Sequence, residues 1–291
     1  MWTSSTRKAF DVDLADVRIR ERGACFTMTI MPATGSGQQT SWSQASLMPA
    51  FPTSRVDVWR VRLDEPTKEE PVKDEPAKAG SDANLLSPDE IARASQFHFE
   101  QDRIHFTRCR SALRFLLAAY LKIPPDKIRF EYLAGGKPYL AAEQNPRALR
   151  FNVSHSAGMA LIAVGSEHQL GIDIEKIRGD VDVTALAERF FSPRERAGLR
   201  ALPAPLRVAG FYACWTRKES FLKATGTGLS FPLTDFSVTT HPDLDPELEE
   251  INGNTEAGKQ WSLADLSGID GYRATVASEH SYSRLDTYAW N

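Results

Sequence analysis

The chain has 291 residues, of which 42% are hydrophobic and 25% charged, and its formal net charge is −3 at pH 7. This is a globular composition, long enough for one large domain or two small ones. The slightly acidic balance gives no overall basic field for non-specific binding to nucleic acid. No apolar run approaches the roughly 20 residues that a membrane-spanning helix needs.

The cysteine pattern indicates a reducing environment. Cys25, Cys109 and Cys214 are far apart and have no metal-binding spacing, so neither a disulfide framework nor a zinc site is expected. The N-terminus mixes basic and acidic residues and has no apolar core of a signal peptide. We therefore expect a soluble, cytoplasmic protein without a membrane partner.

The first part of the chain predicts one strand between two irregular segments. Residues 1–55 are rich in Ser, Thr, Gly and Gln without a sustained period, which predicts a flexible N-terminal extension. Apolar and polar residues alternate over 56–61, as in a strand. The charged, proline-broken segment 64–82 reads as a solvated loop.

Similar features recur along the chain and predict a duplicated fold. The sequence Ser-Pro-x-Glu, typical of a helix start with a capping box, begins at Ser87 and again at Ser192. Two further matches recur in the same order after roughly 110 residues, although chance resemblance is the alternative. We expect an α+β fold of two similar subdomains related by pseudo-twofold symmetry, 56–168 and 171–291, with a ligand cleft between them.

Three basic residues form one side of the helix expected around 102–121. They are Arg103, Arg110 and Arg114, and the opposite side is apolar. Such a stripe is usually solvated, but it can also contact an anion bound in a cleft. Further on, Lys137 in a Gly-Gly-Lys-Pro turn and His155 in Asn-Val-Ser-His-Ser are side chains suited to phosphate contacts.

Acidic residues then alternate with isoleucines in Gly-Ile-Asp-Ile-Glu. The alternation places Asp173 and Glu175 on the same face of a strand. Adjacent carboxylates repel unless a cation lies between them, and all-oxygen ligation favours magnesium over zinc. The alternative is an exposed acidic strand edge.

The helix expected before Gly226 presents Trp215, Glu219 and Lys223 at i, i+4 and i+8, so that a ring, a carboxylate and an ammonium share one face. Taken alone, Glu219 and Lys223 could be an ordinary surface ion pair.

In order, the motifs GGKP, FNVSHS, GIDIE and WTRKESFLKATGTGL resemble those of Sfp-type 4′-phosphopantetheinyl transferases. The resemblance runs from about Val56 to the C-terminus. It implies an enzyme that transfers the phosphopantetheine arm of coenzyme A to a serine of an apo carrier protein, depends on Mg²⁺ and releases 3′,5′-ADP. It places coenzyme A binding in 56–168, and the metal site and carrier docking in 171–291.

The resemblance also implies residue roles. Asp173, Glu175 and Glu219 would hold magnesium, Lys223 would meet the pyrophosphate, and Glu219 or Glu175 would take the proton of the carrier serine. The coenzyme would be contacted by Gly136, Lys137 and Pro138 at its adenine nucleotide, and by Ser154 and His155 at its 3′-phosphate. The basic helix departs from the lysine-containing pattern of some family members, and Arg103, Arg110 and Arg114 would replace those contacts.

The sequence leaves two other functions open. One is a coenzyme A binding interaction module without turnover, and the other is an unrelated magnesium phosphotransferase, although no Walker motif is present. The carrier could be of acyl, peptidyl or aminoadipate-reductase type, and a monomer would suffice. For carrier docking we expect the arginine-rich segment 188–217, whose alternative is a solvated helix. Its candidate residues are Arg189, Arg194, Arg196, Arg200, Arg207 and Arg217, together with Phe190 and Phe191.

Overall fold

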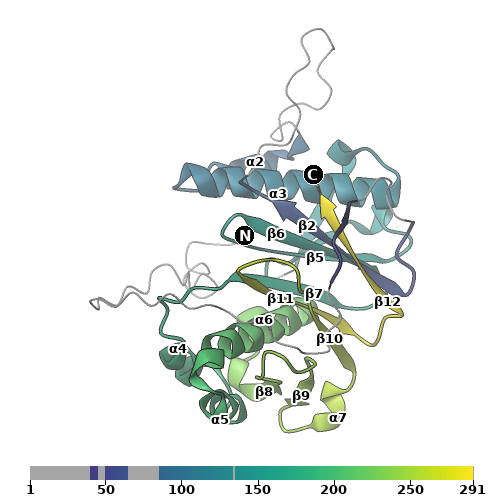
Figure 1. Ribbon diagram of the computed structural model, residues 1–291. Coiled ribbons are helices and arrows are strands. Elements are labelled where there is room, and N and C mark those ends of the chain that lie inside the picture. The colour runs from purple at the N-terminus through teal and green to yellow at the C-terminus, as the bar shows by residue number, and fades with distance from the viewer. Residues whose placement is uncertain (1–39, 45–49, 65–84, 134, 291) are drawn as a thin grey trace.

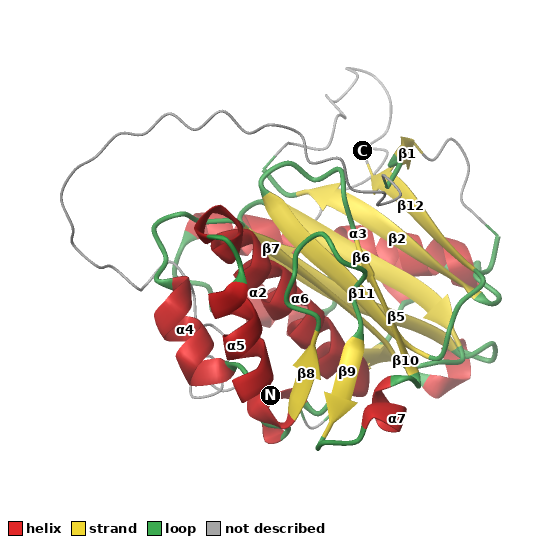
Figure 2. Ribbon diagram, turned by 60° about the horizontal axis from the view of Figure 1, so that its bottom comes forward, coloured by secondary structure: helices red, strands yellow, loops and turns green. Residues whose placement is uncertain are grey.

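Two β-sheets lie at the centre of the protein, with helices outside them (Figures 1 and 2). The computed structural model describes residues 40–44, 50–64, 85–133 and 135–290. The larger sheet has the order β1 (Ser43–Gln44), β12 (Arg284–Trp290), β2 (Arg55–Arg62), β6 (Met159–Ser166), β5 (Leu149–Ser156). The smaller has the order β10 (Trp261–Asp265), β11 (Tyr272–Glu279), β7 (Leu170–Lys176). Two hairpins pair β3 (Phe130–Tyr132) with β4 (Pro138–Leu140), and β8 (Phe236–Val238) with β9 (Leu248–Ile251).

The helices cover the outer faces of the two sheets. On the larger sheet lies α3 (Glu100–Leu121), with α2 (Pro88–Ala94) against it. On the smaller sheet lies α6 (Arg207–Thr225), with α4 (Val183–Phe190) and α5 (Pro193–Ala201) against it and α7 (Thr255–Gly258) near β9 (Figure 1). Short 3-10 helices are η2 (Pro125–Lys127), η3 (Ala142–Gln144), η4 (Ala204–Leu206), η5 (Gly228–Ser230) and η6 (Leu233–Asp235). Within the described part of the chain, no helix combines the length and apolarity that crossing a bilayer requires. The expected α+β class is confirmed.

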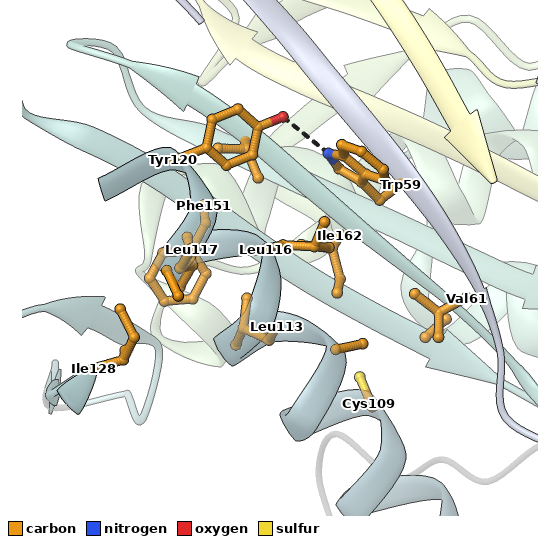
Figure 3. Packing of buried hydrophobic residues seen from close by; sticks show 14 of the residues in the cluster. Trp59, Val61, Cys109, Leu113, Leu116, Leu117, Tyr120, Ile128, Phe151 and Ile162 are labelled. Atoms are coloured by element: carbon orange, nitrogen blue, oxygen red, sulfur yellow. Dashed lines mark hydrogen bonds between the residues drawn. The ribbon is translucent and has the colours of Figure 1, made fainter. Parts of the chain in front are cut away.

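Apolar side chains form three cores, one in each space between layers. In the first, α3 packs on the larger sheet, and the buried indole of Trp59 donates a hydrogen bond to Tyr120 Oη at 3.0 Å (Figure 3). Between the sheets, Ile172 and Ile174 of β7 meet residues of β2 and β6, as their alternation predicts. The third core surrounds α6. Burying both isoleucines leaves the intervening Asp173 directed away from the core between the sheets.

Both predicted capping boxes form, and both glutamates have a second partner. Glu90 and Glu195 each accept the backbone N–H of their N-cap serine at 2.9 Å. Glu90 also pairs with the buried guanidinium of Arg114 on α3, and Glu195 with the buried ammonium of Lys218 on α6, both at 2.7 Å. In each half a short capped helix is thus joined to a long one by a buried ion pair, which supports the predicted duplication.

Strands near both ends of the chain do not follow a simple division into an N-terminal and a C-terminal half. The last strand, β12, belongs to the 171–291 segment but runs parallel to β2 within the larger sheet. Part of the segment expected to be a flexible extension also lies on the fold, because β1 pairs with β12 and Trp42 Nε1 donates to the Ser267 carbonyl at 2.8 Å. The remainder of that segment, 1–39 and 45–49, and most of the proline-broken loop, 65–84, lie outside the described residues.

Candidate active site

The site lies where β5 runs beside β7, at the junction of the two sheets. These strands belong to different sheets, and side chains of β5 bond to backbone amides of β7. Asn152 Oδ1 accepts from the Ile172 amide at 2.9 Å. The hydroxyls two and four residues further on do the same, Ser154 with the Ile174 amide at 3.4 Å and Ser156 with the Lys176 amide at 3.2 Å.

The same serines contact the two acidic side chains of β7. Ser154 Oγ donates to Asp173 Oδ1 at 2.9 Å, and Ser156 Oγ donates to Glu175 Oε2 at 3.0 Å. The structure thereby confirms that Asp173 and Glu175 share a face of one strand, and it shows that this face is turned toward β5.

Helix α6 brings the other predicted residues to these carboxylates. Its close approach to β7 depends on Gly171, where an added Cβ would lie 2.0 Å from the Ser220 carbonyl oxygen. Lys223 Nζ donates to Asp173 Oδ1 at 2.6 Å and to Ser154 Oγ at 2.8 Å. Glu219, one turn earlier, is 8% exposed and lies close enough to Asp173 to interact with it electrostatically.

The cluster holds three carboxylates against one ammonium. Burial, followed by the charge of Asp173, raises the pKa of Glu175 to about 8 and that of Glu219 to about 7. Burial opposes the charge of Lys223, but Asp173 and Glu219 outweigh it and raise the pKa of that ammonium. Negative charge exceeds positive charge when all three carboxylates are ionised, and a further cation would relieve their repulsion.

One oxygen in the cluster has no partner. Asp173 is 2% exposed, and its Oδ2 atom makes no hydrogen bond to any described residue. An unsatisfied buried carboxylate oxygen is costly. Among the described residues no three potential ligands are already arranged as a metal centre, and Lys223 holds the other Asp173 oxygen. The oxygen donors nevertheless suit a hard cation whose coordination is completed by a ligand and water.

His155 is separated from this cluster by the strand itself. It alternates with the two serines, so its side chain leaves the opposite face of β5 and is exposed. The charge of Lys223, in the cluster, acts on it most strongly, and His105 and Asp102 of α3 also lie near enough to act electrostatically. His105 was not singled out from the sequence, where it is one polar residue of an amphipathic helix, and it contacts Asp64 at 2.7 Å.

The Gly-Gly-Lys-Pro turn joins β3 to β4. Gly136 has a φ of +80°, a conformation that glycine adopts without the steric cost of a side chain. Pro138 begins β4. Lys137 Nζ donates to the carbonyls of Leu170, Lys223 and Ala224 at 3.0, 2.6 and 3.0 Å. Burial, with a contribution from Arg150, lowers its pKa to about 8. All three donors of the ammonium are thus used to hold the hairpin against the end of α6.

The three arginines of α3 have different surroundings. Arg103 is exposed and pairs with Glu100. Arg110 lies 3.3 Å from Glu90. Arg114 is 1% exposed, and besides Glu90 it donates to the carbonyls of Pro125 and Ile128. The structure does not bring the three together as one open basic surface, because Arg114 is part of the interior.

The arginine-rich segment also divides into surface and interior. Arg194 and Arg196 of α5 are partly exposed and pair with Glu249 and Glu188, at 2.6 and 3.2 Å. By contrast, Arg217 is 0% exposed and bonds to Asp265 and three backbone carbonyls. Phe191 is 1% exposed within an aromatic cluster with Trp215. Arg217 and Phe191 are therefore unavailable for the surface docking expected of them.

The sequence places the chain among phosphopantetheine-transferring enzymes, and it belongs to the 4′-phosphopantetheinyl transferase superfamily. Residues 169–277 match that superfamily, and residues 70–167 match the N-terminal region of 4′-phosphopantetheinyl transferases. Members of this family transfer phosphopantetheine from coenzyme A to carrier proteins, and the protein is an enzyme of this class.

Named relatives span bacteria and animals. The chain is 38% identical to the 4′-phosphopantetheinyl transferase HetI of Nostoc sp. over 225 residues, covering 77% of this chain and 88% of that protein. Identity to 4′-phosphopantetheinyl transferase Sfp of Bacillus subtilis is 34% over 198 residues, covering 68% and 84%. Identity to the human L-aminoadipate-semialdehyde dehydrogenase-phosphopantetheinyl transferase is 33% over 199 residues, covering 64% of this chain and 64% of that protein.

Proposed function

We propose that the enzyme is magnesium-dependent, that Asp173, Glu175 and Glu219 are the protein ligands of the metal, and that 3′,5′-ADP is the leaving group. The observation that carries this proposal is the unpartnered, buried Oδ2 of Asp173 in a cluster with excess negative charge. Bound there, Mg²⁺ would neutralise charge on the coenzyme's pyrophosphate.

The residues of the site suit phosphoryl transfer to a hydroxyl. Lys223 supplies a positive charge held in place by Asp173 and Ser154, and it can donate to a pyrophosphate oxygen as negative charge develops there. Glu219 and Glu175 are the two carboxylates that could accept the proton of the carrier serine, because burial and the charge of Asp173 raise their pKa values above the ordinary carboxylate range and so make them stronger bases. The nucleophile comes from the carrier, so no serine of this chain needs activation.

For the coenzyme we propose contacts from β5, from α3 and from the turn between β3 and β4. His155 is the exposed candidate for the 3′-phosphate, and Arg103 and Arg110 are the α3 arginines that could add positive charge. The turn at Gly136, Lys137 and Pro138 would border the adenine nucleotide. Ser154, in contrast, faces the metal cluster. We assign Arg114 a structural role.

For the carrier we propose docking on the exposed side of α5, with Arg194 and Arg196 as its basic residues. An acidic carrier helix would compete with the glutamates that these arginines now contact. We further propose that the enzyme acts in the cytoplasm as a monomer; the buried free thiols of Cys109 and Cys214 suit a reducing compartment.

The metal assignment is tested by Asp173→Ala, with Asp180→Ala as a matched control. Asp180 lies on the loop after β7, exposed and paired with Arg178. We expect Asp173→Ala to abolish transfer while the protein stays folded by circular dichroism, because removing one carboxylate relieves repulsion in the metal-free cluster. The control should transfer like the wild type. Normal transfer by Asp173→Ala would refute the assignment.

A further inference from the structure

The hydrogen bonds between β5 and β7 repeat with a period of two residues. Side chains of Asn152, Ser154 and Ser156 each accept one amide of β7. The two serines, in addition, each donate to the carboxylate that precedes this amide. Asn152 accepts the Ile172 amide, which follows a glycine, and bonds to no carboxylate of the described residues. A bond from a β7 amide to a β5 side chain therefore joins the strands at all three positions. A second bond, from a serine hydroxyl to a carboxylate, is added at the two positions where β7 carries an acidic side chain.

The hydroxyl chemistry fixes the direction of each bond. A serine hydroxyl has one proton and two lone pairs. At Ser154 both lone pairs are used, by the Ile174 amide and by Lys223, so the proton can go only to Asp173. Ser156 accepts the Lys176 amide and donates to Glu175. In both cases one carboxylate oxygen is held by a hydroxyl that the backbone of β7 itself orients.

The consequence is seen at Asp173, where the serine and Lys223 engage Oδ1 and leave Oδ2 unpartnered. A carboxylate fixed by one oxygen presents the other in a defined direction. Hydrogen bonds of this kind orient metal-binding carboxylates, and losing them typically weakens metal binding about 10- to 100-fold.

We propose that Ser156 and Ser154 are positioning residues, which set Glu175 and Asp173 in the orientation that binds the metal. This rests on the magnesium site proposed above. Ser156 is the more informative of the two, because Ser154 also holds Lys223, whereas among the described residues the hydroxyl of Ser156 bonds only to the carboxylate and the backbone of β7. The second serine of Asn-Val-Ser-His-Ser thus acts through Glu175 and needs no contact with the coenzyme.

Direct binding of Mn²⁺, a paramagnetic substitute for Mg²⁺, separates this role from a structural one. Electron paramagnetic resonance of the full-length protein gives the Kd for Mn²⁺ without turnover. For Ser156→Ala we expect a Kd about tenfold higher than that of the wild type and an unchanged KM for coenzyme A. Ser156→Thr keeps the hydroxyl and suits a strand, so it should bind Mn²⁺ nearly as the wild type does.

Asn152→Ala is the matched control, because it removes a strand-joining bond without touching a carboxylate. It should lower the melting temperature and leave the Kd for Mn²⁺ unchanged. An unaltered Kd in Ser156→Ala overturns the positioning role alone. Equal weakening in Asn152→Ala also overturns it, since the effect would then belong to the strand junction. If the wild type binds no Mn²⁺, the metal assignment and the positioning role both fail.

Discussion

Replacing Glu219 by glutamine should stabilise the metal-free enzyme while abolishing its activity. Burial, then the charge of Asp173, raises the pKa of Glu219 from 4.5 to about 7. The folded protein therefore binds more protons than the unfolded chain between these two values, and its stability falls as pH rises through this window. Above pH 7 the ionised carboxylate costs about 3 kcal/mol, at about 1.4 kcal/mol for each pKa unit.

Glutamine has a similar shape and does not ionise, so Glu219→Gln should escape that loss. In urea denaturation with EDTA present, we expect its free energy of unfolding to exceed that of the wild type by about 3 kcal/mol at pH 8 and by less than about 1 kcal/mol at pH 5. Glu188→Gln is the control, because Glu188 is exposed and its pKa is lowered chiefly by a hydrogen bond from Arg200. It should give no gain at pH 8. A gain from Glu219→Gln that is absent, or equal at both pH values, would refute the reasoning.

Three further predictions concern the coenzyme, the carrier and the fold. His155→Ala should raise the KM for coenzyme A about tenfold but have little effect with dephospho-coenzyme A, and equal impairment with both donors would exclude the 3′-phosphate contact. Lys223→Ala should instead lower kcat by about 100-fold or more. Replacing both Arg194 and Arg196 by glutamate should raise the KM for the carrier severalfold, weaken the salt dependence of that KM and leave the KM for coenzyme A unchanged. An unchanged KM for the carrier at low salt would place docking elsewhere. Gly171→Ala should destabilise the protein by about 3 kcal/mol in urea denaturation, because its Cβ would overlap the backbone of α6; wild-type stability would contradict that packing.

The sequence was most informative where a local pattern determines the structure. Both capping boxes form because a serine and a glutamate three residues later satisfy each other's backbone groups. The alternation correctly predicted that Asp173 and Glu175 share one face of a strand. Helical spacing correctly predicted that Lys223 and Glu219 lie on the same side of α6.

Long-range partners could not be read from local patterns. A basic residue looks the same in sequence whether it meets solvent or a buried carbonyl, so nothing distinguished the interior Arg114 and Arg217 from surface arginines. The same holds for Lys137, whose three carbonyl partners come from elements distant in sequence. The entry of β12 into the larger sheet is likewise a pairing between chain segments far apart.

The serine contacts to β7 were missed for a related reason. Alternation showed that Ser154 and Ser156 share a face, but only the position of β7 reveals that this face meets the carboxylates. The resemblance instead pointed Ser154 toward the coenzyme, and both of its lone pairs are already used within the protein.

The central claim is tested most directly by the mass of an apo carrier protein after incubation with the enzyme and coenzyme A. With Mg²⁺ present, we expect a gain of roughly 340 Da, the mass of one phosphopantetheine arm, on a single serine. The gain should disappear when EDTA is added, and it should return when excess Mg²⁺ restores the site. Carrier proteins of acyl, peptidyl and aminoadipate-reductase type that all keep their original mass with Mg²⁺ would contradict the transfer, and an undiminished gain in EDTA would contradict its dependence on the metal.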